Sequence, residues 1–142
     1  MAVQVNVFMQ NQPGRLAKAV RALAESGVNI RATTIASSEG FGVAKFLVDK
    51  PGEAAAALRD AGMSAALQNV VAVKMDDSAG GLDEILPLLA EQNVNVKDAY
   101  GFILERGKDA VFVFEVAEPE GLEKHLQESG CKLMTAEDLY GL

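Results

Sequence analysis

The segment Asn11-Gln12-Pro13-Gly14-Arg15-Leu16 has the residue types of a small-molecule site at the start of a helix. The first N–H groups of a helix lack intrahelical partners and carry partial positive charge, so they attract an anion such as a carboxylate. Pro13 is favoured in a first helical turn, and Gly14 lets a ligand approach the backbone. Arg15 opposes the helix dipole, and a bound anion would offset that cost; the alternative is that its side chain only reaches into solvent.

A second polar position, Asn29, follows the expected helix in Gly27-Val28-Asn29-Ile30. The side-chain amides of Asn11 and Asn29 can each hydrogen-bond a polar ligand. Both residues also lie beside Gly or Pro, where Asn often bonds its own backbone in a turn. The residue types therefore leave two interpretations, a ligand contact and turn chemistry.

The elements that position these residues occur twice. Gly14 to Arg31 matches Gly80 to Lys97 at seven of 18 positions, and Phe46 to Gly62 matches Phe114 to Gly130 at five of 17. Composition alone would give roughly one or two matches. We therefore expect two units, residues 1–69 and 70–142.

In the first unit, the alternation of Val3 to Val7 predicts a strand. A helix opens at Pro13-Gly14 and a second runs from Pro51 to Ala61, and between them Asn29–Ser38 and Phe41–Asp49 form a hairpin. A short strand after Gly62 completes the order βαββαβ. This order predicts an α+β fold of the ferredoxin-like type, an antiparallel sheet with helices on one face.

The second unit repeats this order. Pro87 lies inside its first helical pattern and should kink that helix or delay its start. The expected elements are a strand Val70–Met75, a helix Leu82–Gln92, a hairpin Val94–Val116, a helix Gly121–Ser129 and a capping-box turn over Thr135–Tyr140.

The charge balance argues against nucleic acid as a partner. Thirteen basic and 20 acidic residues give a net charge of −7, the wrong sign for neutralising phosphates. The charge is uneven, with +2 over residues 1–69 and −9 over residues 70–142. The acidic half is either a solvated surface or a face for a different partner.

No cofactor, metal or catalytic residue is predicted. Zinc or nickel sites need several soft ligands, and the single cysteine, Cys131, with the single histidine, His125, cannot supply them. We expect His125 on a helix surface and Cys131 as a buried small residue. Nucleophile–base arrangements and Gly-rich phosphate loops are not visible. The sequence therefore predicts a protein that is not an enzyme, with an unrecognised carboxylate site as the alternative.

The composition predicts a cytoplasmic protein. The chain has 142 residues, 49% of them hydrophobic, without an apolar run of the ~20 residues that a membrane span needs. Its N-terminus lacks the pattern of a signal peptide, and one cysteine fits a reducing compartment. No membrane partner is expected.

The loop Asn11-Gln12-Pro13-Gly14-Arg15-Leu16, followed by Gly27-Val28-Asn29-Ile30, resembles the ACT domain, a small-molecule regulatory module of amino-acid metabolism. The loop of that family reads (Asp or Asn)-x-Pro-Gly-x-Leu, and its second strand begins Gly-(Val or Ile)-Asn-Ile. The resemblance covers essentially the whole chain as two consecutive ACT units. In serine-inhibited members, the residues at the positions of Asn11 and Asn29 bind the effector, and Met9 stands where those members have a loop histidine.

The second unit departs from this pattern. Its loop is Asp76-Asp77-Ser78-Ala79-Gly80-Gly81-Leu82, in which Asp77 matches Asn11 and Ala79 replaces the proline, while Asn95 keeps the second asparagine. The ligand contacts that the resemblance implies are Asn11, Gln12, Pro13, Gly14, Arg15, Leu16, Asn29 and Ile30 in the first unit and Asp77, Gly80, Gly81, Leu82, Asn95 and Val96 in the second.

The resemblance implies a regulatory protein that binds a small amino acid and acts in trans on an enzyme of amino-acid metabolism. By the same resemblance, the loop of one unit meets the second strand of a neighbouring unit. The alternative is an interaction or assembly module whose ligand sites have decayed. Val43 and Leu47 share one strand face while Phe46 and Val48 share the other, and an uncovered apolar face is a liability in water. We therefore expect the two units, or two chains, to pack over this face and give a homodimer.

Overall fold

A computed structural model describes residues 1–141. The chain forms two compact units. The N-terminal unit comprises residues 3–68 and the C-terminal residues from Asp138 onward, and the C-terminal unit comprises residues 69–137 together with Met1 and Ala2. The ends of the chain are thus exchanged relative to a division by sequence alone.

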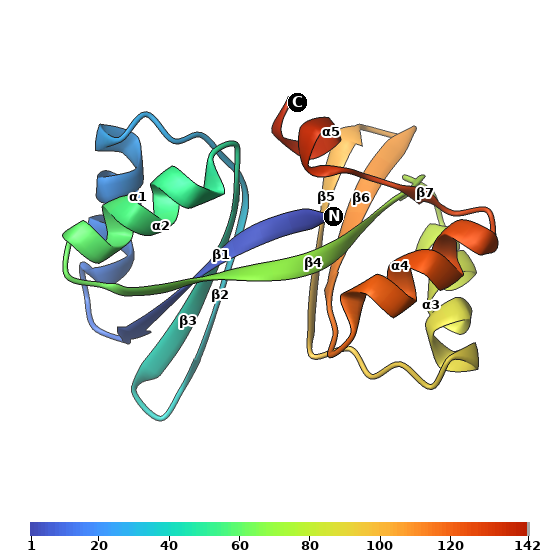
Figure 1. The fold of residues 1–142 in the computed structure, drawn as a ribbon, viewed down its shortest axis with the longest axis horizontal. Helices are drawn as coiled ribbons and strands as arrows, with labels where there is room; N and C mark the ends of the chain where they lie inside the picture. The colour runs from blue at the N-terminus through green and yellow to red at the C-terminus, as the bar shows by residue number, and fades with distance from the viewer. Residues whose placement is uncertain (142) are drawn as a thin grey trace. The chain divides into compact units, whose positions relative to one another are not determined.

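The N-terminal unit is an antiparallel sheet covered on one face by two helices (Figure 1). The strand order is β2-β3-β1-β4, as expected for a βαββαβ chain. Its elements are β1 (Ala2–Gln10), α1 (Arg15–Glu25), β2 (Ile30–Ser38), β3 (Phe41–Val48), α2 (Pro51–Asp60) and the first part of β4 (Ser64–Asp76).

Strand register puts the apolar residues of this unit under the helices. Val5 pairs with Phe46 and Val7 with Ala44, so these four side chains share one face of the sheet. They are fully buried with Leu23 of α1 and Leu58 of α2. The alternation that predicted the strands therefore also predicted their buried face.

The opposite face of β3 also carries apolar residues, as the alternation predicted. Leu47 points away from the helices, because it alternates with Phe46 and Val48, yet it is also fully buried. Phe8 pairs with Val43 on that face and is 50% exposed. The face is thus covered around Leu47, whereas Phe41 at its other end is 66% exposed, and the expected dimer stays a prediction.

The C-terminal unit repeats the architecture, with strand order β5-β6-β4-β7 and two helices on one face (Figure 1). Its core gathers apolar residues of the second part of β4, of β6 and of both helices, among them Val71, Ile85, Phe114 and Leu126. Its elements after β4 are α3 (Gly81–Glu91), β5 (Asp98–Glu105), β6 (Asp109–Glu115), α4 (Pro119–Glu128), β7 (Lys132–Leu133) and α5 (Ala136–Tyr140).

Three local expectations need correction. The short strand after Gly62 and the strand from Val70 are one continuous strand, β4. Pro87 does not delay α3, which begins at Gly81. His125 is not on the surface: its side chain is 20% exposed, and Nε2 lies 3.6 Å from a carboxylate oxygen of Glu91.

The C-terminal segment, expected as a turn, forms the short helix α5 and packs in the N-terminal unit. Leu139 is fully buried. The Tyr140 hydroxyl donates to the backbone oxygen of Val3, and the Val3 N–H donates to the same phenol at 3.3 Å. Arg31 donates through Nη2 to the Tyr140 carbonyl at 3.0 Å. The sequence alone did not place this segment.

Candidate functional site

The loop between β1 and α1 is held by backbone hydrogen bonds. The N–H of Asn11 donates to the carbonyl of Gly40, in the β2–β3 turn, at 2.7 Å. The N–H of Arg15 donates to the carbonyl of Gln12 at 3.2 Å. Because these bonds use only the backbone, the exposed side chains of Asn11 and Gln12 are not consumed in shaping the loop.

The start of α1 is open to a ligand. Gly14 is the N-cap residue, in the left-handed conformation with φ of 87°, and no side chain among the described residues caps the helix. Glycine adopts this φ without strain. The sequence suggested that Pro13 lies in the first helical turn, but it lies before the N-cap residue. Arg15 is the first helical residue and is half-buried, and Leu16 beside it is 37% exposed.

The loop between β4 and α3 has the same backbone path. The N–H of Asp77 donates to the carbonyl of Lys108, in the β5–β6 turn, at 3.1 Å. The N–H of Gly81 donates to the carbonyl of Ser78 at 3.1 Å, and Gly80 caps α3 with φ of 88°. Ala79 in place of a proline thus leaves the loop conformation unchanged.

The side chains distinguish the two loops. The carboxylate of Asp77 accepts a hydrogen bond from the N–H of Gly107 at 2.7 Å, so Asp77 fixes the β5–β6 turn. The first turn of α3 carries Asp83 and Glu84, whereas the first turn of α1 carries no acidic residue. The helix start of α3 is therefore less attractive to an anion than that of α1.

Asn29 lies far from Asn11 within the unit. Its N–H donates to Asp49 Oδ1 at 2.9 Å, and its carbonyl accepts from the Asp49 N–H at 3.2 Å. Asp49 directly follows β3, whereas Gly40, which holds Asn11, directly precedes it. Eight residues of strand separate the two points, about 26 Å at ~3.3 Å per residue.

The C-terminal unit shows the same separation. Asp77 is bonded to Gly107 and Lys108, just before β6. The N–H of Lys97 donates to the carbonyl of Glu115, the last residue of β6, at 2.9 Å, and the exposed Asn95 lies two residues earlier.

The structure therefore does not bring together the two groups of predicted site residues of one unit. In each unit, the residues of the loop before the first helix lie at one end of the third strand, β3 or β6. The residues at the start of the second strand, which include Ile30 or Val96, lie at the other end. A free amino acid is far too short to touch both. A ligand held by a loop and by a second-strand start requires residues from two units.

An open pocket of about 460 Å³ lies beside the start of α3 in the C-terminal unit. Of the predicted contact residues, only Gly81 lines it. A Cβ on Gly81 would lie 2.4 Å from the Asp76 carbonyl oxygen, so only glycine fits there. The lining of the pocket combines apolar and charged side chains. The apolar ones are Met75, Ile85 and Leu88, the charged ones are Lys74, Asp76, Glu84 and Lys132, and Ser129, Gly130 and Cys131 complete the lining. Residue spacing gave no signal for it.

Cys131 lines this pocket and is half-buried, whereas the sequence predicted a buried residue. Burial raises the pKa of its thiol, so the reactive thiolate is scarcer than for a free cysteine. Within residues 1–141, no group of three or more His, Cys, Asp or Glu side chains could hold a metal ion. No helix in that range is long and apolar enough to cross a membrane.

The fold and the paired loops define a class of protein built from two ferredoxin-like units. The family model "ACT domain pair" matches residues 1–141, and the chain belongs to this family. The resemblance of the loop motif and the predicted fold class are thereby confirmed. The family and its fold are those of a regulatory ligand-binding module.

Solved structures share the whole architecture. Protein BT0572 from Bacteroides thetaiotaomicron is 28% identical, with a TM-score of 0.91 over 99% of this chain and 96% of that chain. The regulatory subunit of aspartate kinase from Thermus thermophilus, in its ligand-free form, is 18% identical, with a TM-score of 0.64 over 90% of this chain and 92% of that chain. The corresponding subunit from Thermus flavus is 16% identical, with a TM-score of 0.58 over 90% and 92%. None of the curated proteins matches the chain.

Proposed function

We propose that this protein is a cytoplasmic regulator that binds a small amino acid and acts in trans on an enzyme of amino-acid metabolism. Membership of the ACT domain pair family supports the regulatory part of the proposal. The observation that supports an amino-acid ligand is the start of α1, which has no side-chain cap and is exposed beside the free side chain of Asn11.

The ligand chemistry follows from the first loop. The N–H of Arg15 already donates to the Gln12 carbonyl. A carboxylate fits the remaining N–H groups of the first turn of α1, and the Arg15 side chain adds positive charge beside them. The Asn11 amide can bond either the carboxylate or the ammonium group. The ammonium group would also find the second-strand asparagine of another unit, Asn95 or Asn29.

We propose the first loop as the stronger of the two sites. Asp77 uses its carboxylate on Gly107, and Asp83 and Glu84 add negative charge around the start of α3. Each close pair of like charges costs ~1 kcal/mol or more at the effective dielectric of a protein surface. These observations also favour the second candidate function, an assembly module that binds no ligand, for the C-terminal loop.

A thermal-shift screen against the twenty amino acids tests the proposal. A ligand that binds only the folded state stabilises it by ~2.7 kcal/mol at 100 times its dissociation constant. We expect one or a few small amino acids to raise the melting temperature. No shift with any of the twenty would reject the amino-acid ligand and leave the assembly module.

A further inference from the structure

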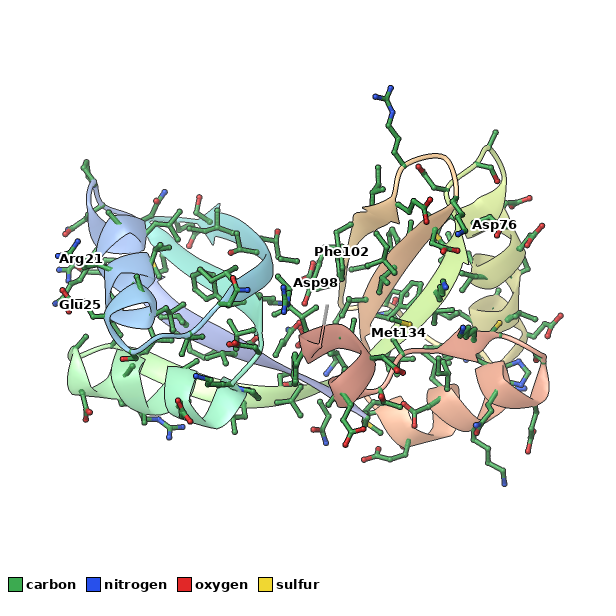
Figure 2. All side chains as sticks on the ribbon, turned by 90° about the horizontal axis from the view of Figure 1, so that it is seen from above. Arg21, Glu25, Asp76, Asp98, Phe102 and Met134 are labelled. Carbon is green, nitrogen blue, oxygen red and sulfur yellow. The ribbon has the colours of Figure 1, made fainter. Side chains whose placement is uncertain are left out.

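The pocket beside the start of α3 lies wholly within the C-terminal unit. Its lining residues come from the end of β4, from α3 and from the segment Ser129–Lys132, which joins α4 to β7. Figure 2 shows Asp76, the last residue of β4, beside α3. The volume of about 460 Å³ is within the range of small-molecule sites, about 300–1,000 Å³. A ligand of this pocket therefore needs neither the first loop nor a second unit.

Two small residues open space in this pocket, as the comparison of the two units shows. Gly81 occupies the loop position of Arg15 in the N-terminal unit, and the N–H of each donates to the carbonyl three residues before it. Cys131 occupies the position of Met63, and the N–H of each donates to the carbonyl five residues before it. In both pairs the C-terminal unit has the smaller side chain. The space beside the start of α3 therefore arises from a difference between the two repeats.

The floor of the pocket is apolar. Ile85 and Leu88 of α3 line it, and the repeat gives alanine at both equivalent positions of α1. Ile85 is buried, and Leu88 and Met75 are half-buried against the same core. A hydrocarbon chain on this floor is favourable, because apolar surface of the chain and of the floor leaves water.

The two lysines of the lining do not bring their ammonium groups into the pocket. Lys74 pairs with Lys132 across β4 and β7, so both side chains share one face of the sheet. Val73 and Leu133, which pair beside them, pack in the core on the other face, under the helices. The Nζ of Lys74 lies 3.3 Å from Asp109 Oδ2. Both lysines therefore line the pocket with their backbone.

The charge that remains in the pocket is negative. Glu84 supplies a carboxylate from the first turn of α3, and its neighbour Asp83 lies outside the lining. Each is a full charge, against about +0.5 at the start of a helix. Ser129 caps the end of α4, where the last carbonyls carry partial negative charge. Asp76 alternates with Met75 along β4, so it lines the pocket with its backbone, and a backbone carbonyl only accepts hydrogen bonds. The pocket therefore favours a cation.

We propose that this pocket binds a small aliphatic amine. Its ammonium group donates hydrogen bonds to the Glu84 carboxylate and to carbonyls at the end of α4, and its hydrocarbon chain packs on Ile85 and Leu88. An α-amino acid fits less well, because its carboxylate would lie next to that of Glu84. Ligand and site both differ from those of the proposed function. The negative charge of residues 70–142 thereby has a task besides solvation.

Cys131 provides a reporter inside the pocket, since it is the only cysteine of the sequence. Its modification by methyl methanethiosulfonate, a small neutral thiol reagent, is followed by the intact mass of the full chain. Burial raises the pKa of the thiol, so the reaction is run at about pH 8.5, where an alkylamine is still protonated, as lysine is with its pKa of about 10.4.

The probe is n-butylamine, and butyrate is its anionic counterpart of the same length. Butylamine at ten times its dissociation constant should slow the modification about tenfold, because the bound amine covers the thiol. Butyrate at the same concentration should leave the rate unchanged. No slowing by butylamine, or equal slowing by butyrate, would overturn the proposal.

Glu84→Gln keeps the size of the side chain and removes its charge. In this variant the butylamine concentration that halves the rate should rise by about tenfold or more. Asp83→Asn is the matched control, since it removes the neighbouring charge outside the lining, and it should raise that concentration by less than about threefold. An unchanged concentration in Glu84→Gln would reject the carboxylate as the amine's partner and overturn the proposal.

A thermal shift provides a second measurement, which does not use the thiol. Butylamine should raise the melting temperature of the wild type. Cys131→Met, which has the residue of the N-terminal unit at this position, should abolish the rise by filling the pocket. A rise of the same size in the folded Cys131→Met chain would place the amine elsewhere and overturn the proposal. These outcomes are independent of the proposed function, since an amino-acid screen without a hit changes none of them.

Discussion

The N–H of Gly107 donates a hydrogen bond to the carboxylate of Asp77 at 2.7 Å, which joins the loop before α3 to the turn before β6. Asn11 occupies the equivalent loop position but is tied to its turn only through its backbone N–H, which donates to Gly40. Two residues at matching positions thus have different tasks. The side chain of Asp77 is structural, and that of Asn11 is available for a ligand.

Asp77→Ala should therefore lower the free energy of unfolding by about 1 kcal/mol, since an exposed bond to a charged group is lost. Asn11→Ala is the matched control and should change it by less than ~0.5 kcal/mol, because its backbone bond survives. Urea denaturation of both variants measures the difference. Equal losses in the two variants would contradict the structural role of Asp77.

Ligand affinity should show the reverse order. Asn11→Ala removes a hydrogen bond to a charged ligand group, worth ~1.5–3 kcal/mol, so affinity should fall roughly tenfold to a hundredfold. Asp77→Ala should cost less and could improve binding by removing a negative charge. Calorimetric titration with the amino acid that gives the largest thermal shift decides between them. Unchanged affinity in Asn11→Ala would exclude the first loop as the site.

The repeat and the strand alternation were sufficient to predict the fold. Identities at a fixed shift of 66 residues fixed the equivalence of Gly14 and Gly80, and the structure gives both the same left-handed conformation. The path of the chain between units was not predictable in this way. Alternation cannot distinguish one long strand from two short ones, so β4 was divided.

The site was predictable only in part. Motif positions located Asn11 and Asn29, but their separation depends on which end of β3 each contacts, and that is a tertiary property. The pocket beside Gly81 is formed by residues from three segments, and none of them has a distinctive pattern in the sequence. The task of Asp77 was likewise hidden, because its partner Gly107 lies 30 residues away.

Gly81 should not tolerate a side chain. A Cβ there would lie 2.4 Å from the Asp76 carbonyl oxygen, so the backbone must shift. We expect Gly81→Ala to destabilise the protein by about 1–3 kcal/mol. Gly121→Ala, in α4, is the matched control: a Cβ there meets no atom within 4 Å, and the better helix former should stabilise by about 0.5–1 kcal/mol. Thermal denaturation compares the two, and a neutral Gly81→Ala would show that the loop adapts.

The C-terminal helix should make stability sensitive to alkaline pH. Burial raises the pKa of Tyr140, partly opposed by the N–H of Val3, which donates to the phenol. The unfolded chain then loses the phenolic proton near pH 10, before the folded chain does. The stabilisation that Tyr140 gains from its raised pKa is therefore complete below pH 10 and is lost as the pH rises toward the folded pKa. Over that range the free energy of unfolding falls by at most ~1.4 kcal/mol per pH unit.

Tyr140→Phe should remove this slope. At neutral pH the variant should be less stable by about 0.5–1.5 kcal/mol, because the hydrogen bond to the Val3 carbonyl is lost. Above pH 10 the gap to wild type should narrow, since only the wild type releases the Tyr140 proton on unfolding. Urea denaturation of both proteins from pH 7 to pH 11 measures the gap, and the lysines contribute equally to each. A gap that stays constant or widens above pH 10 would show that Tyr140 is not buried as a neutral phenol.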